Sequence, residues 1–305
     1  MAVNIVKAVI DGQTYDLSYN DTSKKWEATI TAPSRTSFNE PSNKFGVTVI
    51  ATDHAGNSTT KDRTDATLGG SLQLRVLEKT KPTISLTSPS SGARVISATP
   101  QIKFSLRDSG SGVDISSLAL KIDSGTAIGN NATGMTATSV SGGYDCVYVP
   151  QTALNEGSHN ITISITDNDG NISSLFSSSF VVDTMPPALN ITSPTVGLIT
   201  NNKTITVSGS TNDETSSPVI ITIKVNEVDT GTVDIANGQF SKTVTLTEGE
   251  NIINITAKDT AGLTTKITRT VTLDTKAPII SGVSITPNPV DAGKTYVISV
   301  TVSDS

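Results

Sequence analysis

The sequence contains few of the residues on which disulfide-stabilised or metal-thiolate proteins depend. Cys146 is the one cysteine among 305 residues, so an intrachain disulfide and a cysteine metal cluster are both excluded. Its neighbours, YDCVYV, alternate like a strand, and we expect the thiol to be a small buried core group. Aromatic residues make up only 4% of the chain, so its cores must be built from Val, Ile and Leu, which favours strands.

Long hydrophobic runs and clusters of basic residues are also missing. No stretch of about 18 apolar residues could cross a bilayer, so we expect no membrane insertion. The net charge of -6 is spread without a basic block, which argues against a nucleic-acid partner. Asn4, Lys7 and Asp11 interrupt the apolar N-terminus, so a signal peptide is not expected if Met1 is the native start.

What the sequence does contain is a repeated Asp-x-x-Gly segment. The three copies are ATDHAGNSTT (51–60), ITDNDGNISS (165–174) and AKDTAGLTTK (257–266). An alternating apolar and polar segment precedes each copy, which is the period of a half-buried strand. We therefore expect Asp53, Asp167 and Asp259 to end equivalent strands and to accept hydrogen bonds from the backbone of the following turn.

Proline-containing linkers divide the chain into units. EKTKP (78–82), DTMPP (183–187) and DTKAP (274–278) each precede a new alternating segment. Units of about 100 residues with short alternating segments, many turn residues and no helical period predict an all-β chain of tandem immunoglobulin-like antiparallel β-sandwiches. The predicted units are residues 1–80 (incomplete, without its first two strands), 81–185, 186–276, and 277–305 as the start of a further domain.

These segments resemble the bacterial Ig-like (Big) domain family. The third unit is similar nearly throughout, from ITSP through GQF and AKDTAG to DTKAP, and the second carries RDSGSGVDISSLALKID (107–123). The first unit departs from the pattern and looks like the Ig-like proteins encoded among phage structural genes. The resemblance implies a fold far more strongly than a ligand.

Calcium is the one cofactor that the sequence allows. Its ligands would be the oxygens of turn and linker aspartates, namely Asp167, Asp169 and Asp183, with Asp259 and Asp274 as the counterpart pair. The alternative is that each Asp only forms a turn or caps a linker. The stretch DSGSGVD (108–114) resembles a calcium loop in composition but lacks the spacing of an EF-hand.

Features of an enzyme are sparse, and no catalytic residue is predicted. His54 and His159 fall in different units, and no Gly-rich loop joins a strand to a helix as a phosphate site requires. Trp26, with Tyr15 and Tyr19, could stack on a sugar ring, although a core role in the first unit is the preferred interpretation. The chain is therefore expected to be non-enzymatic.

Two functions follow as hypotheses. The first is a structural or adhesive component of a phage virion, in the tail, baseplate or fibres. Its N-terminal unit would bind other virion proteins or its own subunits, and later units would contact host-cell polysaccharide. The second is a segment of a bacterial cell-surface adhesin or an accessory region of a secreted enzyme. The first places the protein on the virion and the second on the bacterial surface.

Overall fold

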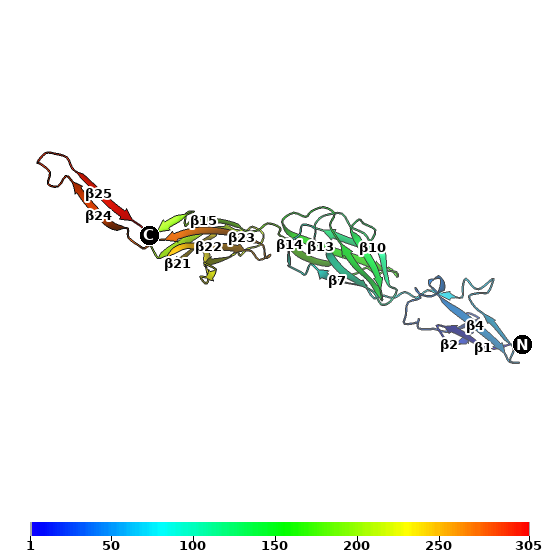
Figure 1. The fold of residues 1–305 in the computed structure, drawn as a ribbon. Helices are drawn as coiled ribbons and strands as arrows, with labels where there is room; N and C mark the ends of the chain where they lie inside the picture. Colours follow the sequence, from blue (N-terminus) through cyan, green and yellow to red (C-terminus); the bar gives the residue numbers. More distant parts are fainter. Residues whose placement is uncertain (1, 305) are drawn as a thin grey trace. The chain divides into compact units, whose positions relative to one another are not determined.

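The computed structural model describes residues 2–304 and is almost entirely β-structure (Figure 1). The chain divides into two compact units, residues 1–93 with 98–181 and residues 94–97 with 182–305. No sheet mixes strands from two of the four predicted domains. The domain boundaries themselves stay a prediction. In residues 2–304 we find no helix with the length and apolar character needed to span a bilayer.

The N-terminal segment forms one sheet instead of a sandwich. Its strands are β1 (Val3–Ile10), β2 (Gln13–Asn20), β3 (Lys25–Glu27), β4 (Phe45–Asp53), β5 (Ser58–Lys61) and β6 (Gln73–Leu74), with the 3-10 turn η1 (Pro41–Asn43) before β4. The order is β3-β2-β1-β4-β5, and β6 also pairs with β4. Asp11 and Gly12 both have positive φ, 46° and 72°, so they form the tight turn that suits an antiparallel hairpin. A small core forms around Val6, Ala8 and Phe45.

The next segment is a two-sheet sandwich. One sheet has the order β10-β13-β14-β8 and the other has β11-β12-β9-β7. The strands are β7 (Thr83–Ser88), β8 (Arg94–Val95), β9 (Ile102–Arg107), β10 (Val113–Ile122), β11 (Met135–Val140), β12 (Gly143–Tyr148), β13 (Gly157–Asp167) and β14 (Phe176–Val182). Alternate residues of β9 and β13 are buried, and the isoleucines and leucine among them form much of the core together with Phe104. Cys146 is 1% exposed in this core, which confirms the prediction for the thiol.

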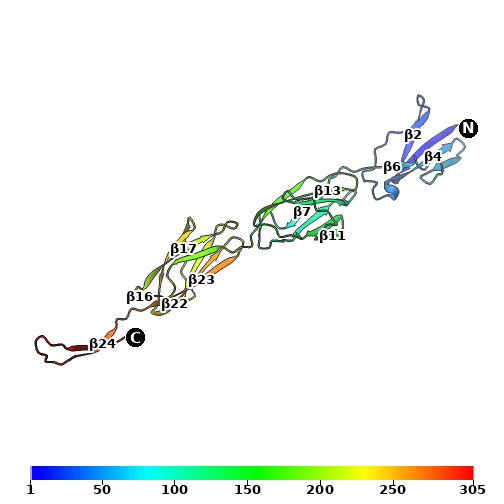
Figure 2. The same ribbon diagram turned by 90° about the horizontal axis from the view of Figure 1, so that it is seen from above.

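A second complete sandwich follows (Figure 2). Its sheets have the orders β15-β17-β21-β20 and β16-β23-β22-β18-β19. The strands are β15 (Ala188–Ser193), β16 (Leu198–Thr200), β17 (Thr204–Asn212), β18 (Ile220–Val225), β19 (Val228–Asp229), β20 (Ile235–Ala236), β21 (Gln239–Thr245), β22 (Gly249–Lys258) and β23 (Thr264–Leu273). The short edge strand β16 pairs in parallel with β23, which departs from the antiparallel pairing expected. It does so because the chain leaves β15 for the opposite sheet without reversing direction.

The last described strands form a hairpin, β24 (Ile279–Thr286) with β25 (Val297–Ser303) (Figure 1). Apolar residues of both strands are exposed, since only two strands are present and neither face is covered by a second sheet. The architecture therefore confirms the predicted all-β, tandem Ig-like fold class. Complete sandwiches occupy the two central segments.

Candidate metal centres

The repeated aspartates form the turns that the sequence predicts. Asp167 Oδ1 accepts hydrogen bonds from the backbone N–H groups of Asp169 at 2.9 Å and Asn171 at 2.8 Å. The carboxylates of Asp53 and Asp259 likewise accept N–H groups two to four residues further along the chain. Each Asp therefore ends its strand by satisfying donors that the turn would otherwise leave unpaired.

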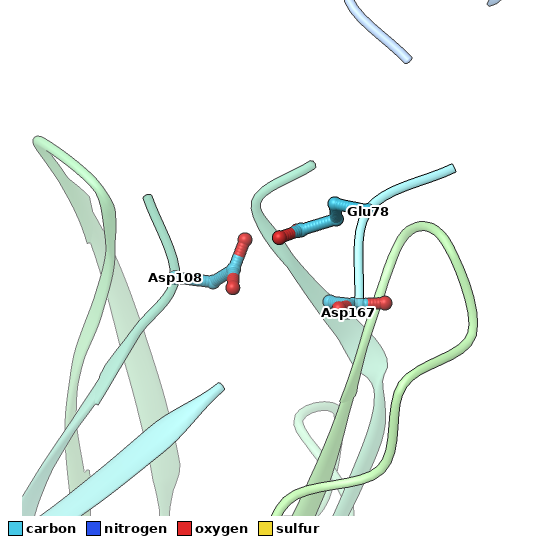
Figure 3. Close-up of side chains that lie close together, drawn as sticks. All are labelled: Glu78, Asp108 and Asp167. Atoms are coloured by element: carbon cyan, nitrogen blue, oxygen red, sulfur yellow. The ribbon is translucent and has the colours of Figure 1, made fainter. Parts of the chain in front are cut away.

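One of these turns belongs to a group of three carboxylates, which we call the Glu78 cluster. Glu78, Asp108 and Asp167 each contribute an oxygen, and these oxygens lie within 4.8 Å of one another (Figure 3). Asp167 is the last residue of β13, Asp108 directly follows β9, and Glu78 lies in the linker before β7. Asp108 and Asp167 are only 6% and 2% exposed, so these two carboxylates are removed from bulk water, while Glu78 is half-buried.

The loop after β9 holds this cluster through backbone donors. Asp108 Oδ1 accepts the N–H of Gly110 at 3.0 Å and of Gly112 at 2.7 Å. The N–H of Ser111 donates to Glu78 Oε1 at 2.7 Å. A Cβ on Gly110 would lie 2.2 Å from Glu78 Cδ, so only glycine leaves room for the Glu78 carboxylate here.

The second carboxylate oxygen of Asp108, Oδ2, has a different environment from Oδ1. Among the residues that the structure describes, Asp108 Oδ2 is buried and has no hydrogen-bond partner. Burial raises the pKa of Asp108, and the negative charge of Glu78 raises it further, while the Gly112 N–H opposes both. The ionised carboxylates of this cluster therefore repel one another without a compensating positive charge.

The second group, the Asp183 cluster, consists of Asp183, Asp213 and Asp259, again with one oxygen each within 4.8 Å of the others. Asp183 directly follows β14 in the linker, Asp213 directly follows β17, and Asp259 directly follows β22. All three are buried, at 0%, 9% and 4% exposure. Both clusters thus combine a linker carboxylate with two carboxylates at strand ends.

In the Asp183 cluster, the local hydrogen bonds use one carboxylate oxygen of each side chain. Asp213 Oδ1 accepts the N–H groups of Thr215 at 2.9 Å and Ser216 at 2.6 Å, and Asp183 Oδ1 accepts the Thr215 hydroxyl at 3.3 Å. Within the described part of the chain, Asp183 Oδ2 and Asp259 Oδ2 are buried without a hydrogen-bond partner. Carboxylate-only groups of this kind offer the oxygen donors that hard cations such as Ca²⁺ bind.

Three of the five predicted calcium ligands lie in these clusters, but not in the predicted groups. Asp167 and Asp183 were expected together, yet they belong to different clusters. The reason is that β14, the strand after β13 and its neighbour in the sheet, lies between them in the chain. Its seven residues extend roughly 23 Å at about 3.3 Å per residue.

The structure also separates Asp259 from Asp274, because a strand again lies between them in the chain. Asp259 follows Lys258, which is paired with Thr264, whereas Asp274 follows Leu273, which is paired with Gly249. The two carboxylates therefore lie at opposite ends of the β22–β23 hairpin. Asp274 instead caps its own linker by accepting the Lys276 N–H at 3.1 Å.

Asp169 also lies outside the Glu78 cluster. Its Oδ2 accepts the hydroxyl of Thr36 and the backbone N–H of Glu78 at 3.2 Å. The carboxylate therefore ties the turn after β13 to the linker and to the segment before η1, all within the first compact unit. This tethering role differs from the ligand role predicted for it.

Glu78, Asp108 and Asp213 are the cluster members that the sequence prediction missed. Two signals were available. Glu78 stands in EKTKP where Asp183 stands in the equivalent linker DTMPP. Asp108 begins the stretch DSGSGVD, whose calcium-loop composition was set aside for lack of EF-hand spacing. Ligands drawn from three separate segments need no EF-hand spacing.

The one buried histidine does not form a catalytic pair. His159 Nδ1 lies 2.8 Å from Asp123 Oδ2, and Nε2 lies 2.8 Å from the backbone oxygen of Asn155. Burial opposes the charge on His159, but these two hydrogen bonds outweigh it and raise its pKa. Because both ring nitrogens face oxygen acceptors, neither is left to take a proton from a nucleophile.

Comparisons with known families agree with this architecture. Residues 82–163 match the family model described as Bacterial Ig domain, and residues 187–275 match the model described as Glucodextranase, domain B. The first match lies within the sandwich of β7–β14 and stops inside β13, whereas the second spans the whole sandwich of β15–β23. Residues 82–163 are therefore similar to a bacterial Ig domain.

A curated relative is Bacillopeptidase F of Bacillus subtilis (strain 168), 29% identical over 129 residues. That similarity covers 42% of this chain and 8% of the relative, so the chain spans less than a tenth of that protein's length. The likeness therefore concerns a segment of Bacillopeptidase F.

Solved structures align with this chain at low similarity. The fibronectin(III)-like modules of Clostridium thermocellum CbhA align with a TM-score of 0.38 and 16% identity, covering 63% of this chain and 94% of that one. A structure concerning host cell surface retention of a 1.5-MDa bacterial ice-binding adhesin aligns with a TM-score of 0.31 and 22% identity, covering 90% of this chain and 87% of that one. At these TM-scores the likeness says nothing about function.

Proposed function

We propose that this chain is a non-enzymatic array of Ig-like domains that contributes architecture or adhesion to a larger bacterial or phage assembly. The observation that supports this proposal is the set of hydrogen bonds that the buried polar side chains form. The clustered carboxylates hold turns and linkers through backbone N–H groups, and both nitrogens of His159 are engaged by oxygens. These groups maintain the fold and leave no general base facing a substrate site.

Two biological settings are candidates for this chain, a bacterial protein and a phage virion. The segment similarity to Bacillopeptidase F favours a bacterial cell-surface protein or an accessory region of a secreted enzyme. The resemblance of the first unit to phage-encoded Ig-like proteins favours the virion, where that unit would contact other virion proteins or further subunits. We propose the bacterial setting, because it accords with the similarity to Bacillopeptidase F, and retain the virion as the alternative.

Antibody against the third unit, residues 186–276, tests the setting. Fractions of a culture that produces the protein are separated into cell envelope, medium and phage particles, and each is probed by immunogold labelling and mass spectrometry. The bacterial setting predicts label on envelopes or in the medium. Label confined to purified particles would establish the virion alternative instead.

The absence of catalysis is tested separately. Purified protein and its His159→Gln variant are compared for hydrolysis of peptide and polysaccharide substrates. Equal, background rates are expected from both proteins. Turnover by the wild type that the variant loses would contradict the non-enzymatic assignment, whatever the outcome of the labelling.

A further inference from the structure

The two carboxylate clusters are copies of one arrangement. In each, a linker residue (Glu78 or Asp183) meets the Asp after the second long strand of the sandwich (Asp108 or Asp213). The third member is the Asp of the repeated Asp-x-x-Gly turn, Asp167 or Asp259. The N-terminal sheet has the turn, with Asp53, but Asp53 joins no cluster among the described residues.

Turn formation does not account for all of these carboxylate oxygens. A turn needs one acceptor oxygen, and Oδ1 of Asp108, Asp213 and Asp259 serves that purpose. Oδ2 of Asp108, Asp183 and Asp259 is buried and has no partner among residues 2–304. Buried polar atoms are normally hydrogen-bonded, so the oxygens left over in both clusters, one in the Glu78 cluster and two in the Asp183 cluster, indicate a missing partner.

The missing partner is positively charged. Each cluster brings three carboxylates together, and no Lys, Arg or His forms a salt bridge with either cluster in the described part of the chain. Ionised carboxylates are stable in a buried position only when paired or when they coordinate a metal. A shared proton could neutralise one carboxyl but would leave the others ionised.

We propose that the Glu78 cluster and the Asp183 cluster each bind one calcium ion, so that the chain binds two. The ligands are oxygens only, which suits a hard cation and disfavours zinc. Oxygens bound to one ion at about 2.4 Å can be at most about 4.8 Å apart, and the carboxylate oxygens of each cluster meet that limit. Backbone oxygens and water would complete the coordination. This inference does not depend on the cellular setting proposed above.

Each ion fastens a linker to the sandwich that follows it. Glu78 and Asp183 precede the first strands of their sandwiches, whereas the other ligands belong to turns at the strand ends. Without the ion, the linker carboxylate is held next to two like charges. With it, that residue becomes a ligand, so at Glu78 calcium would reinforce the hydrogen bonds that already hold the linker to the sandwich.

Calorimetric titration of the full 305-residue chain, first stripped with chelator, tests the proposal. We expect a stoichiometry of two Ca²⁺ for the wild type and one for Asp213→Asn, because the Asn retains Oδ1 for the Thr215 and Ser216 N–H groups but loses the charge. Gly110→Ala should also bind one, since its Cβ displaces the Glu78 carboxylate without removing any charge. Asp53→Asn, which alters the same kind of turn outside either cluster, should bind two.

Thermal unfolding separates ion binding from a purely structural role. In chelator, Asp213→Asn should unfold at the same temperature as the wild type or higher, because repulsion is relieved. In millimolar Ca²⁺ the order should reverse, since the wild type gains stability from the ion that the variant cannot bind. An equal loss of stability in both buffers would show a structural role only. In the titration, an absence of Ca²⁺ binding, or binding of Mg²⁺ without binding of Ca²⁺, would likewise overturn the proposal.

Discussion

At the scale of single residues, the side chains of this protein are used for two purposes at once. Asp123 has a positive φ of 52°, a conformation that Asp and Asn tolerate better than most residues. Its Oδ1 accepts the Asn160 N–H at 2.8 Å, while Oδ2 meets His159 Nδ1. One carboxylate thereby closes a turn and fixes the ring of a buried histidine.

This pair should make stability depend on pH. The pKa of His159 is raised, so its stabilising effect is complete below the unfolded value of about 6.5 and is lost as pH rises through the higher folded value. For Asp123, burial opposes the charge, but the Asn160 and His159 hydrogen bonds outweigh it and lower the pKa. Its contribution is complete above about pH 3.8 and is lost as pH falls through the folded value. The pair therefore stabilises most between about pH 4 and 6.5.

Asp123→Asn should remove that contribution while it keeps the acceptor for the Asn160 N–H. We expect a loss below about 1 kcal/mol at pH 5.5, since Asp123 is 46% exposed and solvent screens the charge, and a smaller loss at pH 8.5. Urea unfolding of wild type and variant at both pH values measures it. A difference that does not change with pH would show that the charge on His159 is unimportant.

At the scale of strands, close packing of the second complete sandwich depends on a residue without a side chain. Gly209 lies in β17, between β15 and β21, opposite Ile191 and Phe240. A Cβ there would lie 2.1 Å from the backbone oxygen of Asn190 and 2.9 Å from Phe240 Cζ. The first contact involves the backbone, so it cannot be relieved by a rotamer change.

Gly209→Ala should therefore destabilise the sandwich. We expect about 1–3 kcal/mol, the usual cost of overpacking a well-packed site. The neighbouring substitution Ser210→Ala, which changes a side chain on the opposite face of the strand, should stay within about 0.5 kcal/mol. Chemical denaturation of both variants gives the comparison. Equal stability of the two variants would mean that β15 shifts to accommodate the methyl group at no cost.

At the scale of the whole chain, the two complete sandwiches have separate cores. The hydrophobic core of the sandwich of β15–β23 is built from side chains within residues 189–273, and Ile255 in this core is fully buried. Ile163 occupies the corresponding place in β13 of the preceding sandwich, also at 0% exposure. A cavity made in one core should therefore leave the other intact.

We expect scanning calorimetry to resolve more than one transition. Ile255→Ala should destabilise one transition by about 2–5 kcal/mol, and Ile163→Ala should destabilise a different one by a similar amount. Each variant serves as the control for the other. If either substitution lowered every transition together, the sandwiches would unfold as one cooperative unit.

Much of this organisation follows from the sequence alone, because its signals are local. Alternation of apolar and polar residues predicts strands such as β13 and β22, and Asp-x-x-Gly predicts the turns after them. Both depend on residues within a few positions of one another. Repetition of those signals was enough to predict tandem Ig-like sandwiches.

Tertiary structure decided which carboxylates converge. The sequence pattern correctly predicted that Asp167 and Asp259 lie in turns. It also grouped them with Asp183 and Asp274, which lie one strand further along the chain. The actual partners come from segments far apart in the sequence, as with Glu78, Asp108 and Asp167. Their meeting depends on sheet order and strand length, which fix the end of the sandwich at which each residue emerges. No pattern of neighbouring residues encodes that choice.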